Sequence, residues 1–149
     1  MRLVSPLAVV FLVSTVAHAD LVGFVSDPLS SPAGDQSLGA FTGSVDLQAQ
    51  PGGVGSLTIE LTNLSQLGGR ITGIAFGGVG LEQWVFDANA SVGLGPDWAN
   101  PDAILNVNPF GQRDFGAILG RDSWQGNGSP AGGIAAGATA TFVFTRLAV

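Results

Sequence analysis

The sequence predicts an all-β fold, an antiparallel β-sandwich of the jelly-roll or immunoglobulin-like type with Gly-rich loops. Apolar and polar residues alternate over several short segments, as they do along strands with one buried and one exposed face. These segments are separated by loops in which many of the 23 glycines and 8 prolines lie, as is typical of sandwiches and jelly rolls. No stretch carries apolar residues at helical spacing over an adequate length, so we expect strands throughout.

The clearest alternation lies at the centre of the chain, in residues 55–76. Leu57, Ile59 and Leu61 alternate with polar residues, which predicts a strand whose apolar side faces the core. Residues 70–76 have strand character too, and residues 63–69 form a polar, glycine-containing connection between the two segments. Strands joined by such a loop favour an antiparallel hairpin, which we place at the centre of the sandwich.

Other segments complete the predicted strands. A strand is expected around Trp84 and Phe86, with Trp84 in the core, and near the end of the chain Phe142 and Phe144 should lie on one face of a strand. The remaining strands are expected at residues 20–26, 40–47, 82–88, 114–119 and 138–147.

The N-terminus has the three parts of a secretory signal peptide. Arg2 supplies a positive charge, an apolar run follows, and residues 17–19 (AHA) provide small residues at a cleavage site. The apolar run is shorter than the ~20 residues that span a bilayer. We therefore expect residues 1–19 to be a cleaved signal peptide and residues 20–149 to be a single secreted domain, with no membrane association after signal removal.

Composition excludes several classes of function. The chain has no Cys and no Tyr, and its single histidine, His18, lies in the expected signal peptide. A Ser-His-Asp triad and the usual zinc or copper ligands are therefore absent from the expected mature chain, which favours a non-enzymatic role. Its four arginines and eleven acidic residues give a formal charge of 4 − 11 = −7, which argues against nucleic acid as a partner.

The loop sequence GPDWANPDA and a later tryptophan offer a speculative ligand site. Asp97 and Asp102 could bind Ca²⁺, for which carboxylate oxygens are suitable ligands. Trp98 and Trp124 lie outside the clear strand patterns and could stack against a sugar ring. The competing interpretation of the two aspartates is that they are Asx-turn residues that shape the loop around Pro101. Trp84 lies in a strand pattern and is expected in the core, so Trp98 and Trp124 are the better candidates for a sugar contact.

Polar strand residues allow two further interpretations. The expected outer threonines could form a flat polar binding face, although threonine is also simply common on exposed strand faces. These residues are Thr58, Thr62, Thr139, Thr141 and Thr145. The dipeptide Arg-Asp occurs at Arg113 and again at Arg121, and exposed ion pairs are its expected role. Asn63, Asn89 and Asn127 begin N-glycosylation patterns, and Asn127-Gly128 also suits a turn.

Four segments resemble a class of exported bacterial proteins that usually end in a PEP-CTERM sorting tail: FTGSVDLQ, GSLTIELTNLS, GGRITGIAFGGV and AGGIAAGATATFVFT. The resemblance covers most of residues 40–145 and implies a β-sandwich in bacteria that make extracellular polysaccharide. The Pro-Glu-Pro motif, apolar anchor and basic end of that class do not follow Thr145, so release rather than anchoring is expected.

Together these observations predict a secreted, non-enzymatic, extracellular or matrix-associated protein, and the resemblance implies extracellular polysaccharide as its partner. The alternative is a carbohydrate-binding or calcium-dependent binding module. No cofactor other than Ca²⁺ is expected.

Overall fold

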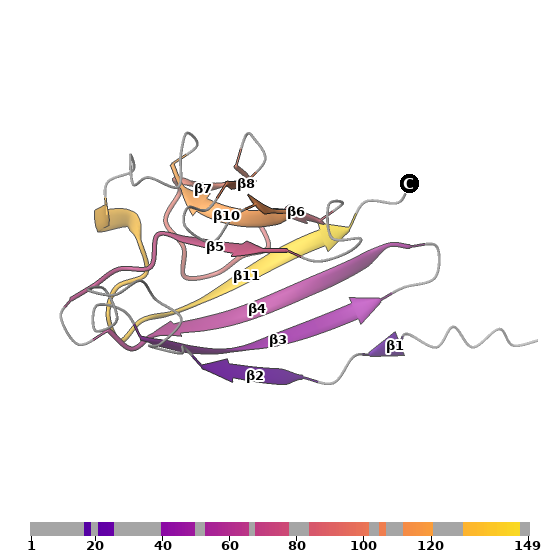
Figure 1. Ribbon diagram of the computed structural model, residues 1–149, viewed down its shortest axis with the longest axis horizontal. Helices are drawn as coiled ribbons and strands as arrows, with labels where there is room; N and C mark the ends of the chain where they lie inside the picture. Colours follow the sequence, from indigo (N-terminus) through magenta and orange to yellow (C-terminus); the bar gives the residue numbers. More distant parts are fainter. Residues whose placement is uncertain are drawn as a thin grey trace, which may run out of the picture.

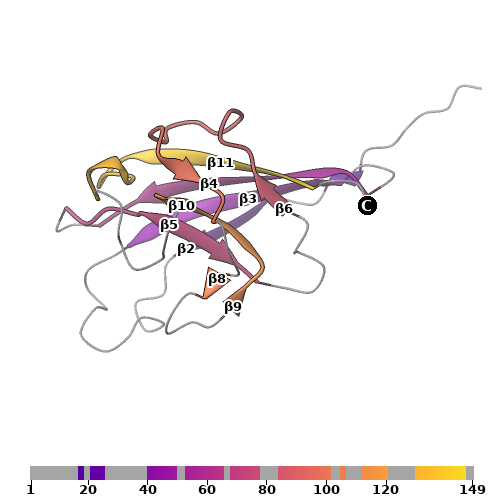
Figure 2. The ribbon, with the colours of Figure 1, turned by 90° about the horizontal axis from the view of Figure 1, so that it is seen from above.

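The computed structural model describes residues 17–18, 21–25, 40–49, 53–65, 68–77, 84–101, 105–106, 112–120 and 130–146, with only the backbone described at 17–18, 105–106 and 130. Two antiparallel β-sheets pack face to face, which confirms the predicted all-β sandwich (Figures 1 and 2). The described residues contain no α-helix, and therefore none that is long and apolar enough to cross a membrane. A 3-10 turn is described at Pro130–Gly132.

The larger sheet has the strand order β3-β4-β11-β6, and two short strands share the outer edge of β3. β2 pairs with the first half of β3, and β1 pairs with its end. The bounds are β1 Ala17–His18, β2 Val22–Val25, β3 Phe41–Ala49, β4 Gly55–Asn63, β6 Trp84–Phe86 and β11 Thr139–Arg146.

The smaller sheet has the order β5-β10-β7, and a separate ribbon is formed by β8 and β9. The bounds are β5 Gly73–Phe76, β7 Trp98–Ala99, β8 Leu105–Asn106, β9 Gln112–Arg113 and β10 Phe115–Leu119. β10 is buried along its whole length because it is the central strand of this sheet and faces the core.

The predicted central hairpin is wrong. β4 pairs with β3 on one edge and with β11 on the other, so neither edge is open to the strand that follows it. The chain instead crosses to the second sheet, where β5 pairs with β10. The true hairpin joins β3 to β4, whose register runs from Phe41 opposite Asn63 to Ala49 opposite Gly55.

The predicted faces of β4 and β11 are confirmed. Leu57, Ile59 and Leu61 are buried, whereas Glu60 is exposed. On the neighbouring strand, Phe142 and Phe144 are fully buried and lie opposite Ile59 and Leu57. Cross-strand pairing thus places these side chains in one apolar layer.

Aromatic rings join the two sheets. Phe115 of β10 lies 5.0 Å from Phe144 between ring centroids, edge to face. Trp98 of β7 meets Phe142 at 5.2 Å, again edge to face. This is the favoured geometry for aromatic pairs, and it fixes the smaller sheet above β11. Trp84 is also buried in this core, as predicted.

The first two strands bear on the N-terminal predictions. β2 lies within the strand expected at residues 20–26. β1 lies inside the expected signal peptide, so cleavage after Ala19 would remove its two pairs with β3. The rest of the expected signal peptide lies outside the described residues.

Candidate functional site

The outer face of the larger sheet is a continuous polar surface built from β3, β4 and β11. Alternation directs every second side chain of each strand away from the core, and the register aligns these side chains in rows. The rows are Thr42–Thr62–Thr139, Ser44–Glu60–Thr141, Asp46–Thr58–Val143 and Gln48–Ser56–Thr145. Eleven of these twelve residues are polar and the twelfth is Val143; we call the set the polar face.

The strand geometry sets the spacing of these groups. Adjacent strands lie about 4.8 Å apart, and successive same-face residues along a strand are about 7 Å apart. Two contacts within the polar face help to orient its side chains. The hydroxyls of Thr62 and Thr139 are 2.8 Å apart, and Gln48 Nε2 donates to Asp46 Oδ2 at 3.1 Å. The result is a regular array of hydroxyl, carboxylate and amide groups, all at least partly accessible.

The two carboxylates give this array a negative charge. Glu60 lies at the centre of its row, and Asp46 lies one row further along β3. No arginine belongs to the rows, and the whole chain has a formal charge of −6. Anionic polymers should therefore be repelled from the polar face, whereas neutral hydroxyl-rich molecules should not.

The structure places Trp98 in the core rather than in a surface loop. Its side chain is 3% exposed and belongs to β7. The indole Nε1 donates to the Gly132 carbonyl at 3.2 Å, so the polar atom of the ring already has a partner. In this arrangement the ring faces are used for packing against protein, and a sugar could reach them only if β7 moved.

The remaining residues of the predicted loop site are described only in part. Asp97 is exposed, and its backbone carbonyl accepts a hydrogen bond from Gly120 N at 2.9 Å. Asp102 and Trp124 lie outside the described residues. Within the part of the chain that is described, no three His, Cys, Asp or Glu side chains lie close enough together to hold a metal ion. Calcium binding through Asp97 and Asp102 therefore stays a prediction.

Asn63 has a structural position that its glycosylation pattern did not suggest. Its side chain is fully buried at the end of β4. Nδ2 donates to the carbonyls of Gly69 and Ile134, both at 2.8 Å, and Oδ1 accepts from Ser65 N at 3.0 Å. A glycan could not be attached in the folded state. The signal available in the sequence was a polar residue at the inward-facing end of an apolar strand.

Asn100 is a second asparagine whose role sequence analysis missed. Its Oδ1 accepts from Phe86 N at 2.7 Å, and its Nδ2 donates to Phe86 O at 3.0 Å. The carboxamide thus occupies the position of a peptide group in a neighbouring strand. The backbone N–H and carbonyl of Phe86 on the edge of β6 are therefore both hydrogen-bonded, which helps to prevent another strand from pairing with β6 at this residue.

Comparison with protein-family models, with curated proteins and with solved structures found no match to this chain. The polar face is therefore interpreted from its own geometry.

Proposed function

We propose that this protein is an exported, non-enzymatic β-sandwich that acts outside the cell as a matrix-associated protein and binds neutral polysaccharide through its polar face. The observation that supports this function is the alignment of hydroxyl, carboxylate and amide groups on three adjacent strands. The N-terminal signal pattern and the lack of nucleophile–histidine pairs in the expected mature chain agree with it.

The chemistry of the polar face suits a sugar polymer. Each threonine or serine hydroxyl can donate one hydrogen bond and accept others, as sugar hydroxyls do. Carboxylates such as Glu60 accept hydrogen bonds from sugar hydroxyls more strongly than neutral groups do. A single exposed hydrogen bond adds only about 0.5–1.5 kcal/mol, so useful affinity requires several rows to engage one chain. A polymer meets this requirement because its repeating units bind as a linked series.

The binding test compares neutral with anionic polysaccharide. Affinity electrophoresis of the purified protein through gels containing dextran, glucomannan or alginate should show retardation in at least one neutral gel and none in alginate. The double variant Thr58→Ala/Thr141→Ala removes hydroxyls from two adjacent rows and should weaken retention about tenfold. Asn89→Ala, at an exposed turn residue, is the matched control.

Two results would contradict the proposal. One is the absence of retardation in any neutral gel, and the other is equal binding by the double variant and the control. Melting curves for both variants separate a lost contact from a lost fold.

Export is tested separately by the intact mass of the protein recovered from its natural host. Cleavage after Ala19 should give a chain that begins at Asp20 and lies outside the cytoplasm. A product that retains residues 1–19 in the cytoplasm would contradict the export part of the proposal.

A further inference from the structure

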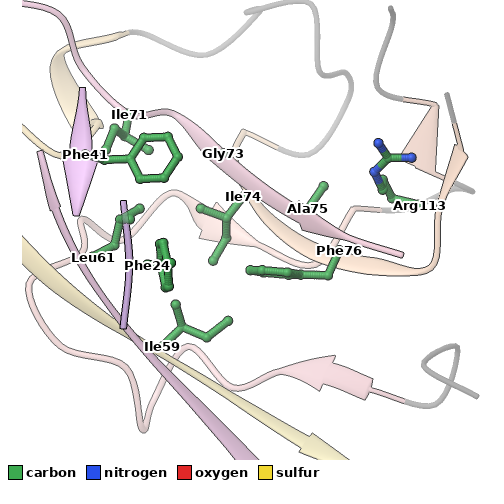
Figure 3. Close-up of a pocket in the computed structure, with 10 residues that line it drawn as sticks. All are labelled: Phe24, Phe41, Ile59, Leu61, Ile71, Gly73, Ile74, Ala75, Phe76 and Arg113. Carbon is green, nitrogen blue, oxygen red and sulfur yellow. The ribbon is translucent and has the colours of Figure 1, made fainter. Parts of the chain in front are cut away.

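The two sheets enclose an apolar cleft where the smaller one ends. β5 is an edge strand, because the order of the smaller sheet is β5-β10-β7. Phe115 and Trp98 hold this sheet over β11, and β5 lies towards β4 and β2. A cavity of about 380 Å³ lies between these strands (Figure 3). This volume falls at the lower end of the range for small-molecule sites, about 300–1,000 Å³.

The walls of the cleft are almost entirely apolar. Ile59 and Leu61 come from β4, and Ile74 and Phe76 come from β5. Phe24 and Phe41 lie edge to face, with ring centroids 6.1 Å apart. Phe41 remains 36% exposed, so folding leaves part of this apolar surface accessible to a ligand.

Among the described residues that line the cleft, Arg113 is the one that carries a charge. Figure 3 shows Phe41 with Ile71 at one end of the cleft and Arg113 at the other, on the side of β5 where Ala75 lies and opposite to Ile74 and Phe76. Arg113 Nη1 donates to the Gln112 carbonyl at 2.8 Å, and the planar guanidinium carries further N–H donors. The neighbouring Asp114 lines a second cleft, beside Trp84, and its Oδ2 also lies near Gly77. A Cβ atom added to Gly77 would be 3.6 Å from Asp114 Oδ2 and 3.2 Å from Arg113 Cδ.

This separation of an apolar end from a cationic end defines the class of ligand. We propose that the cleft binds a single-chain amphiphile with a carboxylate head, such as a medium-chain fatty acid. The chain packs between β4 and β5, and the carboxylate accepts charge-assisted hydrogen bonds from Arg113. The small volume favours one acyl chain rather than two. This site lies on the inner side of the larger sheet and does not depend on the polar face.

The test compares dodecanoate with dodecan-1-ol, which has the same chain length but no charge. Titration calorimetry on the purified protein, with its N-terminus established by mass spectrometry, should detect binding of both. Arg113→Gln should weaken dodecanoate at least about tenfold and leave dodecan-1-ol within about twofold. Arg146→Gln makes the same charge change in β11, outside the cleft lining, and should leave both ligands unaffected.

Two cleft variants test where the apolar chain binds. Ile74→Trp should fill the cavity and abolish binding of both ligands. If that variant does not fold, Phe41→Ser removes an aromatic wall at a partly exposed position and should weaken both ligands.

The proposal is overturned if the wild-type protein does not bind dodecanoate. It is also overturned if Arg113→Gln weakens both ligands equally or neither, or if Arg146→Gln has the same effect. The Thr58→Ala/Thr141→Ala variant should bind dodecanoate normally, so failure at this site is distinguishable from failure of the polysaccharide proposal.

Discussion

At the scale of single residues, the buried carboxamide of Asn63 ties three parts of the chain together. It contacts the carbonyls of Gly69, where the chain leaves the larger sheet, and Ile134, which leads back to β11. Arg70 reinforces the same junction, because its Nη1 donates to the carbonyls of Ala131 and Gly133 at 3.1 and 3.0 Å. Buried polar groups of this kind stabilise a fold when every hydrogen bond is made.

Replacing Asn63 should therefore be costly. Asn63→Ala removes three hydrogen bonds and leaves buried backbone groups without partners, at about 1–3 kcal/mol for each unsatisfied group. We expect urea denaturation to show a loss of at least about 2 kcal/mol in the free energy of unfolding. Asn89→Ala should change it by less than about 0.5 kcal/mol. A loss for Asn63→Ala as small as that would contradict the role assigned to this side chain.

Gly43 occupies a place in β3 that has no room for a side chain. A Cβ atom here would clash with the Glu60 carbonyl oxygen and would lie 2.6 Å from Phe24 Cζ. Gly23, on the adjacent strand β2, is the matched comparison, because its nearest neighbour would be 3.8 Å away. Glycine is required at one position and not at the other.

The expected result is a clear difference between two alanine variants. Gly43→Ala should lower the melting temperature by several degrees, since overpacking costs about 1–3 kcal/mol. Gly23→Ala should leave it unchanged or raise it slightly, because alanine restricts the unfolded chain. Equal melting temperatures for the two variants would show that β3 and β4 do not approach as closely as described.

At the scale of the element, β4 is the strand that both faces of the larger sheet depend on. Its inward residues form the floor of the core, and its outward residues form the middle column of the polar face. Because the side-chain period is two, a slip of one residue would exchange these faces. The register is held on both edges, by β3 and by β11.

A charge on the inward side of β4 should prevent folding. Ile59 is 1% exposed, and Ile59→Asp would bury an unpaired carboxylate as well as lose the apolar contacts of the side chain. We expect no cooperative unfolding transition by circular dichroism. Glu60→Thr, one residue further along, should melt within a few degrees of wild type. A folded Ile59→Asp protein would place this side chain outside the core.

At the scale of the whole molecule, the two sheets are held together by a few aromatic side chains. Trp98 joins β7 of the smaller sheet to Phe142 of the larger one, and its indole N–H bonds to the 3-10 turn. These contacts help to fix the smaller sheet over β11.

Trp98→Ala should destabilise the protein by about 3–5 kcal/mol, the usual cost of deleting a large buried ring. Trp98→Phe keeps most of the packing and should cost less. Chemical denaturation monitored by circular dichroism measures both changes. An unchanged free energy of unfolding for Trp98→Ala would contradict the buried position of this side chain and would favour the alternative that it is a surface residue that contacts a ligand. Because unfolding alone would abolish glycan binding by this variant, a binding measurement on Trp98→Ala must be accompanied by a measurement of its stability.

The fold class, most strands and their buried faces could be predicted from the amino-acid sequence. This is possible because alternation is a local property. The polar residues on either side of Ile59, and the pattern around Phe142, indicate which face of each strand is buried. Part of the polar face was also predictable, since Thr58 and Thr141 each lie between two apolar residues of their own strand and must therefore point to the other side of the sheet.

Which strands pair and which surfaces meet depends on contacts between segments that are far apart in the sequence. The hairpin prediction failed because pairing depends on which strand edges are already occupied, and β11, remote in sequence, takes the second edge of β4. Trp98 is in the core because β7 pairs with β10, a contact that no local pattern records. The cleft depends on the smaller sheet being narrower than the larger one, which is a property of the assembled layers and of no single segment.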